Sequence, residues 1–264
     1  MSGQVSGQAS APVLKVTDLK KAYGAIQAVA GVSFEVMPGE IFGVIGPNGS
    51  GKTTMFNSVL GQITPDAGRI ELNGHDITNK SPMQLSRLGV GRTFQTLQVF
   101  GKMSVRDNLI VAAQEHHGTL LSRMVAPSDS GLSDKADALI DQFRIRHVAD
   151  KLAGELSYGQ QKLVDIAMAF MSEPALVLLD EPCAGVNPSL VGGISTLLKE
   201  LNAKRGATRS GRQGGSFVVI EHNMDFVMDL CHRIMVMVEG SVMAIGTPAE
   251  IRANKQVLDA YLGN

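Results

Sequence analysis

Residues 46–54 form a glycine-rich segment that ends in one lysine and two threonines. The segment matches the pattern G-x-x-x-x-G-K-[ST], in the order Gly46, Pro47, Asn48, Gly49, Ser50, Gly51, Lys52, Thr53 and Thr54. Glycines let a backbone wrap closely around an anion with its N–H groups directed inward. Lys52 would reach the β- and γ-phosphates of a nucleotide, and the Thr53 hydroxyl would ligate Mg²⁺. These residue types predict a nucleotide site, but they do not say which reaction it serves.

Two acidic residues follow a fully apolar run further along the chain. Residues 175–179 are expected to form a buried central strand, and Asp180 and Glu181 stand at its carboxyl end. Open α/β sheets bind their ligands at this end of the strands. Asp180 would hold Mg²⁺, and Glu181 would aim at the attacking water. His222 also follows an apolar run, at residues 217–220, which places it beside the same phosphate site.

Three further features are weaker candidates for function. Tyr23 could stack on a base, although its position alone favours a tyrosine packed on the surface. His116 and His117 have no further ligand at metal-site spacing, which favours a solvated loop over a metal site. Residues 203–216 carry four basic residues and no acid, so a flexible solvated loop is favoured over a nucleic-acid or lipid contact.

The apolar pattern predicts the elements that position these residues. Short apolar or alternating runs predict strands at residues 13–19, 28–37, 41–45, 69–72, 175–179, 217–220, 233–238 and 241–245. Helical patterns occur at residues 53–60, 104–113, 133–144, 157–171 and 187–201, with a short helix after Thr247. Asn73 and Gly74 predict a hairpin, so antiparallel strands are added to a parallel core. Residues 114–133 are expected to form a mobile connection.

Composition sets the broad class. The chain has 264 residues, 44% of them hydrophobic and 19% charged, which is typical of a globular protein. A formal net charge of −1 argues against a dedicated nucleic-acid binder. Cys183 and Cys231 are the only cysteines, which suggests free thiols in a reducing compartment. The sequence has no run of 18 apolar residues, and residues 1–12 are expected to form a frayed tail, not a signal peptide.

The segment before the helix at 157–171 is the most specific signal. Its residues are Leu156, Ser157, Tyr158, Gly159, Gln160 and Gln161, and they resemble the LSGGQ signature of ABC-transporter ATP-binding subunits. The chain resembles this family over residues 13–264, because residues 46–53 match Walker A and residues 176–181 match Walker B. Three further matches are the Q-loop glutamine, the switch histidine and the adenine-stacking aromatic, at Gln95, His222 and Tyr23.

Two departures from the usual motifs point to a narrower group. Tyr158 replaces the first glycine of the signature pair, and Asn187 replaces the usual D-loop aspartate in the segment at 184–188. Both forms are similar to the ATP-binding subunits of branched-chain amino acid importers. Residues 91–95, 220–224 and 260–263 also resemble that group.

The resemblance implies an α/β fold, with a RecA-like P-loop NTPase core, an antiparallel β subdomain and an inserted α-helical subdomain. After a disordered tail at residues 1–12, a single cassette domain is expected at 13–264. Within it, residues 13–95 and 173–264 would form the nucleotide-binding core with its β subdomain. Residues 96–172 would form the helical subdomain that bears the signature.

The resemblance also implies the cofactors, ATP and Mg²⁺, and a division of the site between two subunits. The expected ATP-binding residues are Tyr23, Gly46, Pro47, Asn48, Gly49, Ser50, Gly51, Lys52, Thr53, Thr54, Ser157, Tyr158, Gly159 and Gln160. The expected catalytic residues are Glu181, His222 and Gln95, and the expected Mg²⁺ ligands are Thr53, Gln95 and Asp180. The residues at 157–160 would complete the γ-phosphate site of a partner subunit, so that ATP joins two subunits head to tail.

The function implied is that of an ATP-hydrolysing motor of an importer, with branched-chain amino acids as cargo. Urea, short amides or other amino acids are alternative cargoes. A soluble ABC ATPase acting on DNA or ribosomes is less favoured, because the chain has one cassette, no long heptad run and no net positive charge. Expected partners are a second ABC ATPase, identical or related, transmembrane permease subunits and, indirectly, a substrate-binding protein, but no nucleic acid. The expected location is peripheral, on the cytoplasmic face of a bacterial inner membrane.

Overall fold

A six-stranded sheet forms the centre of the molecule. The computed structural model describes residues 11–93, 96–113, 130–205 and 215–262. The strand order is β10-β9-β3-β8-β7-β6. These strands are β3 (Ile41–Ile45), β6 (Val90–Arg92), β7 (Leu176–Asp180), β8 (Ser216–Ile220), β9 (Arg233–Val238) and β10 (Ser241–Gly246). All pair in parallel except β10, which is antiparallel to β9. The predicted parallel core is therefore confirmed.

A second sheet is antiparallel, with the strand order β2-β1-β4-β5. Its strands are β1 (Leu14–Tyr23), β2 (Ile26–Val36), β4 (Ala67–Leu72) and β5 (His75–Asp76). The turn between β4 and β5 is made by Asn73 and Gly74, both with positive φ. Such a turn matches the twist of the flanking strands, and it confirms the predicted hairpin.

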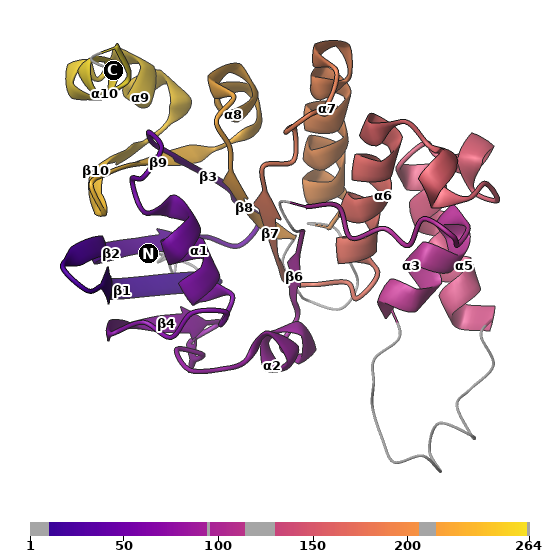
Figure 1. Cartoon of the computed structure of the whole chain (residues 1–264), viewed down its shortest axis with the longest axis horizontal. Coiled ribbons are helices and arrows are strands. Elements are labelled where there is room, and N and C mark those ends of the chain that lie inside the picture. Colours follow the sequence, from indigo (N-terminus) through magenta and orange to yellow (C-terminus); the bar gives the residue numbers. More distant parts are fainter. Residues whose placement is uncertain (1–10, 94–95, 114–129, 206–214, 263–264) are drawn as a thin grey trace, which may run out of the picture.

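Helices cover the central sheet. They are α1 (Lys52–Val59), α2 (Pro82–Arg87), α3 (Val105–Ala113), α5 (Ser130–Gln142), α6 (Tyr158–Phe170), α7 (Pro188–Arg205), α8 (Met224–Leu230), α9 (Pro248–Ala253) and α10 (Lys255–Leu262). Two short 3₁₀ helices lie at Arg146–Val148 and Ala153–Glu155. Figure 1 shows the antiparallel sheet on one side of the molecule, the group α3, α5 and α6 on the other, and the central sheet between them. No helix in the described part of the chain is long and apolar enough to cross a membrane.

The side chains of β3 alternate between two apolar cores. Phe42 and Val44 pack with the antiparallel sheet and α1, and the Phe42 ring stacks on Phe34 of β2 with centroids 5.3 Å apart. Ile41 and Ile45 belong to the core that contains the helices. Full burial of a side chain this size contributes about 1.5–3 kcal/mol. The strand before residues 46–51 is thus fixed on both faces.

Aromatic contacts join the helical group to the central sheet. The Phe170 ring at the end of α6 lies edge-on to Phe217 of β8, with centroids 5.6 Å apart. On its other side Phe170 meets Phe143, with centroids 6.0 Å apart. Offset and edge-on aromatic pairs contribute about 0.5–1.5 kcal/mol beyond burial. The helix that begins at the signature segment is therefore anchored to the sheet at its far end.

Several predicted boundaries are wrong. The connection expected at 114–133 is shorter, because α5 already begins at Ser130, and α7 continues to Arg205, into the loop expected at 203–216. Leu201 is buried near the end of α7, and the exposed Ala203 and Lys204 continue the helix beyond it. The parts of these two loops at 114–129 and 206–214, the pair His116 and His117, and residues 1–10 lie outside the described residues.

The sequence patterns did not predict α2, β6, α8 and α10, nor the two short 3₁₀ helices. The helices α2 and α8 have only six and seven residues, too few for a periodic pattern to be detected. Each does carry a cap that the sequence contains. Ser81 and Gln84 form a capping box on α2, and the Asn223 side chain accepts a hydrogen bond from Phe226 N on α8.

Candidate nucleotide site

The glycine-rich segment connects β3 directly to α1. Gly51 is the N-cap of α1, with φ of 93°, and an added Cβ would lie 2.0 Å from the Ala28 carbonyl oxygen. Only glycine fits there. Because Gly51 has no side chain to cap the helix, the first N–H groups of α1 are left for another acceptor. A helix N-terminus of this kind binds phosphate through its N–H groups and its dipole.

Lys52 is buried, with only 5% of its surface exposed. Its Nζ donates hydrogen bonds of 2.8 Å to Gly46 O and 3.0 Å to Pro47 O. Burial lowers the pKa of Lys52, and the nearby Glu181 carboxylate acts in the opposite direction. The ammonium group is thus held over the segment at 46–51, where an outer phosphate would lie.

The turn between β9 and β10 supports the same segment. Gly240 N donates a hydrogen bond of 3.1 Å to Ser50 O, and Ala30 N donates one of 2.8 Å to Gly240 O. Ser50 is itself buried. This support links residues far apart in the sequence, and the motif at 46–54 contains no sign of it.

Thr53 and Asp180 line one cavity of about 220 Å³, together with Thr93 and Thr96. Asp180 N donates a hydrogen bond of 3.1 Å to Thr93 Oγ1, which fixes the end of β7 against β6. Burial, and next the Glu181 carboxylate, raise the pKa of Asp180. A divalent cation would offset this effect. Gln95, which stands between Thr93 and Thr96 in the sequence, lies outside the described residues.

The oxygens in this cavity fit Mg²⁺, which prefers hard oxygen ligands. Thr53 offers a hydroxyl and Asp180 a carboxylate. Within the described ranges no group of three or more His, Cys, Asp or Glu side chains could hold a metal by itself. A magnesium ion held by one or two protein groups plus phosphate oxygens agrees with this sparse donor set.

Glu181 and His222 lie side by side at the carboxyl ends of β7 and β8. The two strands pair Asp180 with Ile220, so the residues that follow also become neighbours. Glu181 Oε1 lies 3.2 Å from His222 Nε2, and both side chains are partly exposed. Glu181 has φ of 47°, in the left-handed region. Strained residues of this kind gather at functional sites, at a cost of about 1–3 kcal/mol each.

Tyr23 ends β1 at the β1–β2 hairpin. Its side chain is 49% exposed, and the Lys21 ammonium lies 5.7 Å from the ring centroid. The ring is therefore not packed into the core, and it remains accessible to a planar ligand.

Ser157 caps α6, and Gln160 completes a capping box. Ser157 Oγ accepts a hydrogen bond of 3.4 Å from Gln160 N, and Gln160 Oε1 accepts one of 3.1 Å from Ser157 N. Tyr158 is 43% exposed and lies against Gly185, where an added Cβ would be 2.8 Å from Tyr158 Cε1. Figure 1 places α6 and α1 on different sides of the central sheet. One chain therefore does not bring residues 157–160 to its own segment at 46–54.

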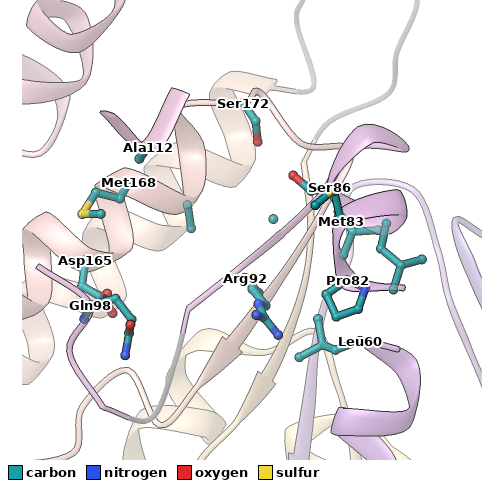
Figure 2. A pocket seen from close by; sticks show the side chains of 14 residues that line it. Leu60, Pro82, Met83, Ser86, Arg92, Gln98, Ala112, Asp165, Met168 and Ser172 are labelled. Atoms are coloured by element: carbon teal, nitrogen blue, oxygen red, sulfur yellow. Dashed lines mark hydrogen bonds between the residues drawn. The ribbon is translucent and has the colours of Figure 1, made fainter. Parts of the chain in front are cut away.

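A larger cavity, of about 360 Å³, lies between α2, β6, α3 and α6 (Figure 2). Arg92 and Asp165 point into it from opposite walls. Burial lowers the pKa of Arg92 and raises that of Asp165, whose Oδ1 accepts a hydrogen bond of 3.2 Å from Gln98 N. The exposed Met83 side chain forms part of its edge. No pattern in the sequence indicates this cavity.

A glycine loop between β3 and α1, a lysine at the start of α1 and two acids at the carboxyl end of β7 in the same sheet define a phosphate-loop nucleotide-hydrolysing site. A family model described as ABC transporter matches residues 29–184, and one described as branched-chain amino acid ATP-binding cassette transporter matches residues 241–264. The chain belongs to the ABC transporter family, as one of its ATP-binding, ATP-hydrolysing subunits.

Curated relatives agree over nearly the full length. The high-affinity branched-chain amino acid transport ATP-binding protein BraF of Pseudomonas aeruginosa is 35% identical, over 96% of this chain and 99% of BraF. The probable branched-chain amino acid transport ATP-binding protein LivG of Archaeoglobus fulgidus is 38% identical, over 95% of each chain. A solved ATP-binding cassette of an ABC transporter in its ADP conformation is 34% identical, with a TM-score of 0.84, over 97% of this chain and 100% of that one. The predicted ABC cassette fold is thereby confirmed.

Proposed function

We propose that this chain powers the import of branched-chain amino acids from the cytoplasmic face of a bacterial inner membrane. The cargo is inferred from residues 241–264, which match the family model described as branched-chain amino acid ATP-binding cassette transporter. The names of the curated relatives support it, as do Tyr158 and Asn187, which follow the form of this group of importers. An ATPase subunit does not contact the cargo, so its own site leaves the cargo open.

The residues of the site take the following roles in this proposal. The segment at 46–54 binds the phosphates of ATP, with Lys52 on the β- and γ-oxygens and Tyr23 against adenine. Thr53, Asp180 and Gln95 hold Mg²⁺, which when bound neutralises phosphate charge. Glu181 orients the attacking water and accepts its proton. His222 lies 3.2 Å from Glu181, holds its carboxylate in place and faces the γ-phosphate.

A second ATPase subunit, identical or related, completes the site. Its residues 157–160 approach the γ-phosphate with the N-terminus of α6, which offers N–H donors and a partial positive charge. The separation of α6 from α1 within one chain supports this arrangement. Hydrolysis would then separate the two subunits and transmit the state of the nucleotide.

The permease would dock at the 360 Å³ cavity beside the helical subdomain at 96–172. Met83, Leu88 and Phe100 are exposed apolar side chains on the segments near this cavity, with 62%, 44% and 50% of their surfaces accessible. Gln95 directly precedes this subdomain in the sequence. It would couple the presence of the γ-phosphate to the position of the subdomain. A substrate-binding protein would act through the permease, and nucleic acid is not among the expected partners.

Uptake by living cells tests the cargo. Cells that lack this chain are expected to lose uptake of labelled leucine, isoleucine and valine at low external concentration. The wild-type chain should restore it, and the Lys52→Ala chain should not. Normal uptake of all three in the deleted strain, with no redundant system present, would contradict the cargo. Loss of urea or amide uptake instead would assign a different cargo to the same motor.

The unusual signature tyrosine supports a second prediction. Tyr158→Gly is expected to leave ATP affinity of the isolated chain within about twofold, because Tyr158 lies outside the segment at 46–54. The substitution removes the Tyr158 ring that lies against Gly185. It should lower ATP-driven dimer formation and turnover by roughly tenfold, equivalent to about 1.4 kcal/mol. Binding is measured by calorimetry and dimer formation by light scattering. Tyr158→Phe keeps the ring and should behave as wild type; equal turnover in all three proteins would disprove the role of the ring.

A further inference from the structure

Glu221 follows β8 directly and precedes His222, and its side chain is only 4% exposed. Buried carboxylates are rare in proteins unless their charge is compensated. The pKa of the nearby Cys183 thiol is raised, mainly by burial and secondly by the Glu221 carboxylate. The thiol therefore stays neutral and does not compensate the charge of Glu221. The compensation comes instead from backbone N–H groups, which reach Glu221 from two different loops.

The two carboxylate oxygens of Glu221 are used separately. Oε1 accepts a hydrogen bond of 2.8 Å from Cys183 N, in the loop that follows β7. Oε2 accepts hydrogen bonds of 2.7 Å from His222 N and 3.0 Å from Asn223 N, in the loop that follows β8. One carboxylate thus ties together the two loops that carry Glu181 and His222.

We propose that Glu221 is a positioning residue for ATP hydrolysis. It holds the Glu181 carboxylate and the His222 ring at their distance of 3.2 Å by fixing the backbone on both sides. Glu181 needs such support, because its left-handed backbone is strained and persists only when its surroundings enforce it. The inference rests on the proposed roles of Glu181 and His222.

A neutral isostere cannot make the same bridge. Glutamine offers one acceptor oxygen, and its NH₂ group would face either Cys183 N or the N–H groups of His222 and Asn223. A buried N–H group left without a partner destabilises the folded chain, so one of the two loops should move. Displacement of about 1 Å in a catalytic group can lower a rate by about 10²-fold.

Glu221→Gln in the full-length chain is therefore expected to lower kcat for ATP hydrolysis by about tenfold to a hundredfold. KM and ATP affinity should stay within about twofold, because the hydrogen bonds of Glu221 do not reach the segment at 46–54. Amide hydrogen exchange should show lost protection at Cys183, His222 or Asn223. Glu221→Asp keeps the charge but is too short to span both loops, so it should show the same fall in kcat if the glutamine variant does not fold.

Glu40 provides a matched control. It directly precedes β3, whereas Glu221 lies beside the carboxyl end of that strand. It is also buried, at 7% exposure, and its Oε2 accepts a hydrogen bond of 2.7 Å from Met37 N. Glu40→Gln removes a buried carboxylate from the same sheet, so it should cost stability as Glu221→Gln does while kcat per folded molecule is unchanged.

The outcomes separate the inference from the proposed function. If kcat falls no further in Glu221→Gln and Glu221→Asp than in Glu40→Gln, while Glu181→Gln is inactive, only the inference about Glu221 is overturned. If Glu181→Gln hydrolyses ATP at the wild-type rate, the proposed role of Glu181 fails, and the inference fails with it. A fall in apparent kcat that only matches the loss of folded protein, with KM unchanged, would identify a merely structural role and would also overturn it.

Discussion

Glu181→Gln is expected to keep ATP bound while hydrolysis slows by roughly 10²- to 10⁴-fold, the range for a lost general base. The amide keeps the size of the carboxylate and can still accept a hydrogen bond from His222, which lies 3.2 Å away. It cannot take the proton of the attacking water. Because binding survives and hydrolysis does not, the variant should also accumulate as an ATP-bound dimer. Single-turnover hydrolysis and size-exclusion chromatography with ATP measure the two effects.

Glu173 provides the control for this substitution. Like Glu181 it has a left-handed backbone, with φ of 48°, but it lies at the turn between α6 and β7. Glu173→Gln therefore removes the same charge from the same backbone conformation away from the site, and kcat should be unchanged. Wild-type hydrolysis by Glu181→Gln would show that another residue polarises the water.

Local sequence patterns predicted the parts of the site that are built from adjacent residues. β3, the glycine segment and α1 follow one another without a gap, and the structure has them within one residue of the predicted bounds. β7 and β8 were also recognised, because strands buried on both faces are apolar throughout. The neighbours Asp180, Glu181 and His222 could be placed at the same sheet edge for that reason.

Contacts between distant segments could not be predicted in the same way. Gly240 supports Ser50 only because β9 lies next to β3, and Glu221 meets Cys183 only because β8 lies next to β7. Strand order is a property of the whole fold, and neither contact changes the local pattern of charge or apolarity. Glu221 was visible as an acid at a strand end, but its burial was not.

The signature residues show a different limit. Ser157 and Gln160 were recognised by type and order, and they form the capping box that such a helix start favours. Their site of action could not follow from one chain, because α6 and α1 lie on different sides of the central sheet. The motif therefore identified residues 157–160, while their action at the nucleotide site of a second subunit stays a proposal.

Lys52→Ala is expected to remove measurable ATP binding. The ammonium group, held over the segment at 46–51, would contribute two charge-assisted hydrogen bonds to the phosphates, each worth about 1.5–3 kcal/mol. Their loss corresponds to a decrease in affinity of roughly 10²- to 10⁴-fold. Titration calorimetry with ATP, with hydrolysis prevented by Glu181→Gln in both proteins, measures it.

Loss of binding by unfolding is not expected. Burial lowers the pKa of Lys52, so the folded chain holds this proton less tightly than the unfolded chain does. Wherever the lysine is protonated in both states, keeping its charge therefore opposes folding, and its removal should leave the unfolding midpoint nearly unchanged. Lys15→Ala removes the same charge from an exposed ion pair with Glu35, at 2.7 Å, and should bind ATP normally. Unchanged ATP affinity in Lys52→Ala would overturn the assignment of residues 46–54 as the phosphate site, while equal losses in both lysine variants would reduce it to an effect of net charge.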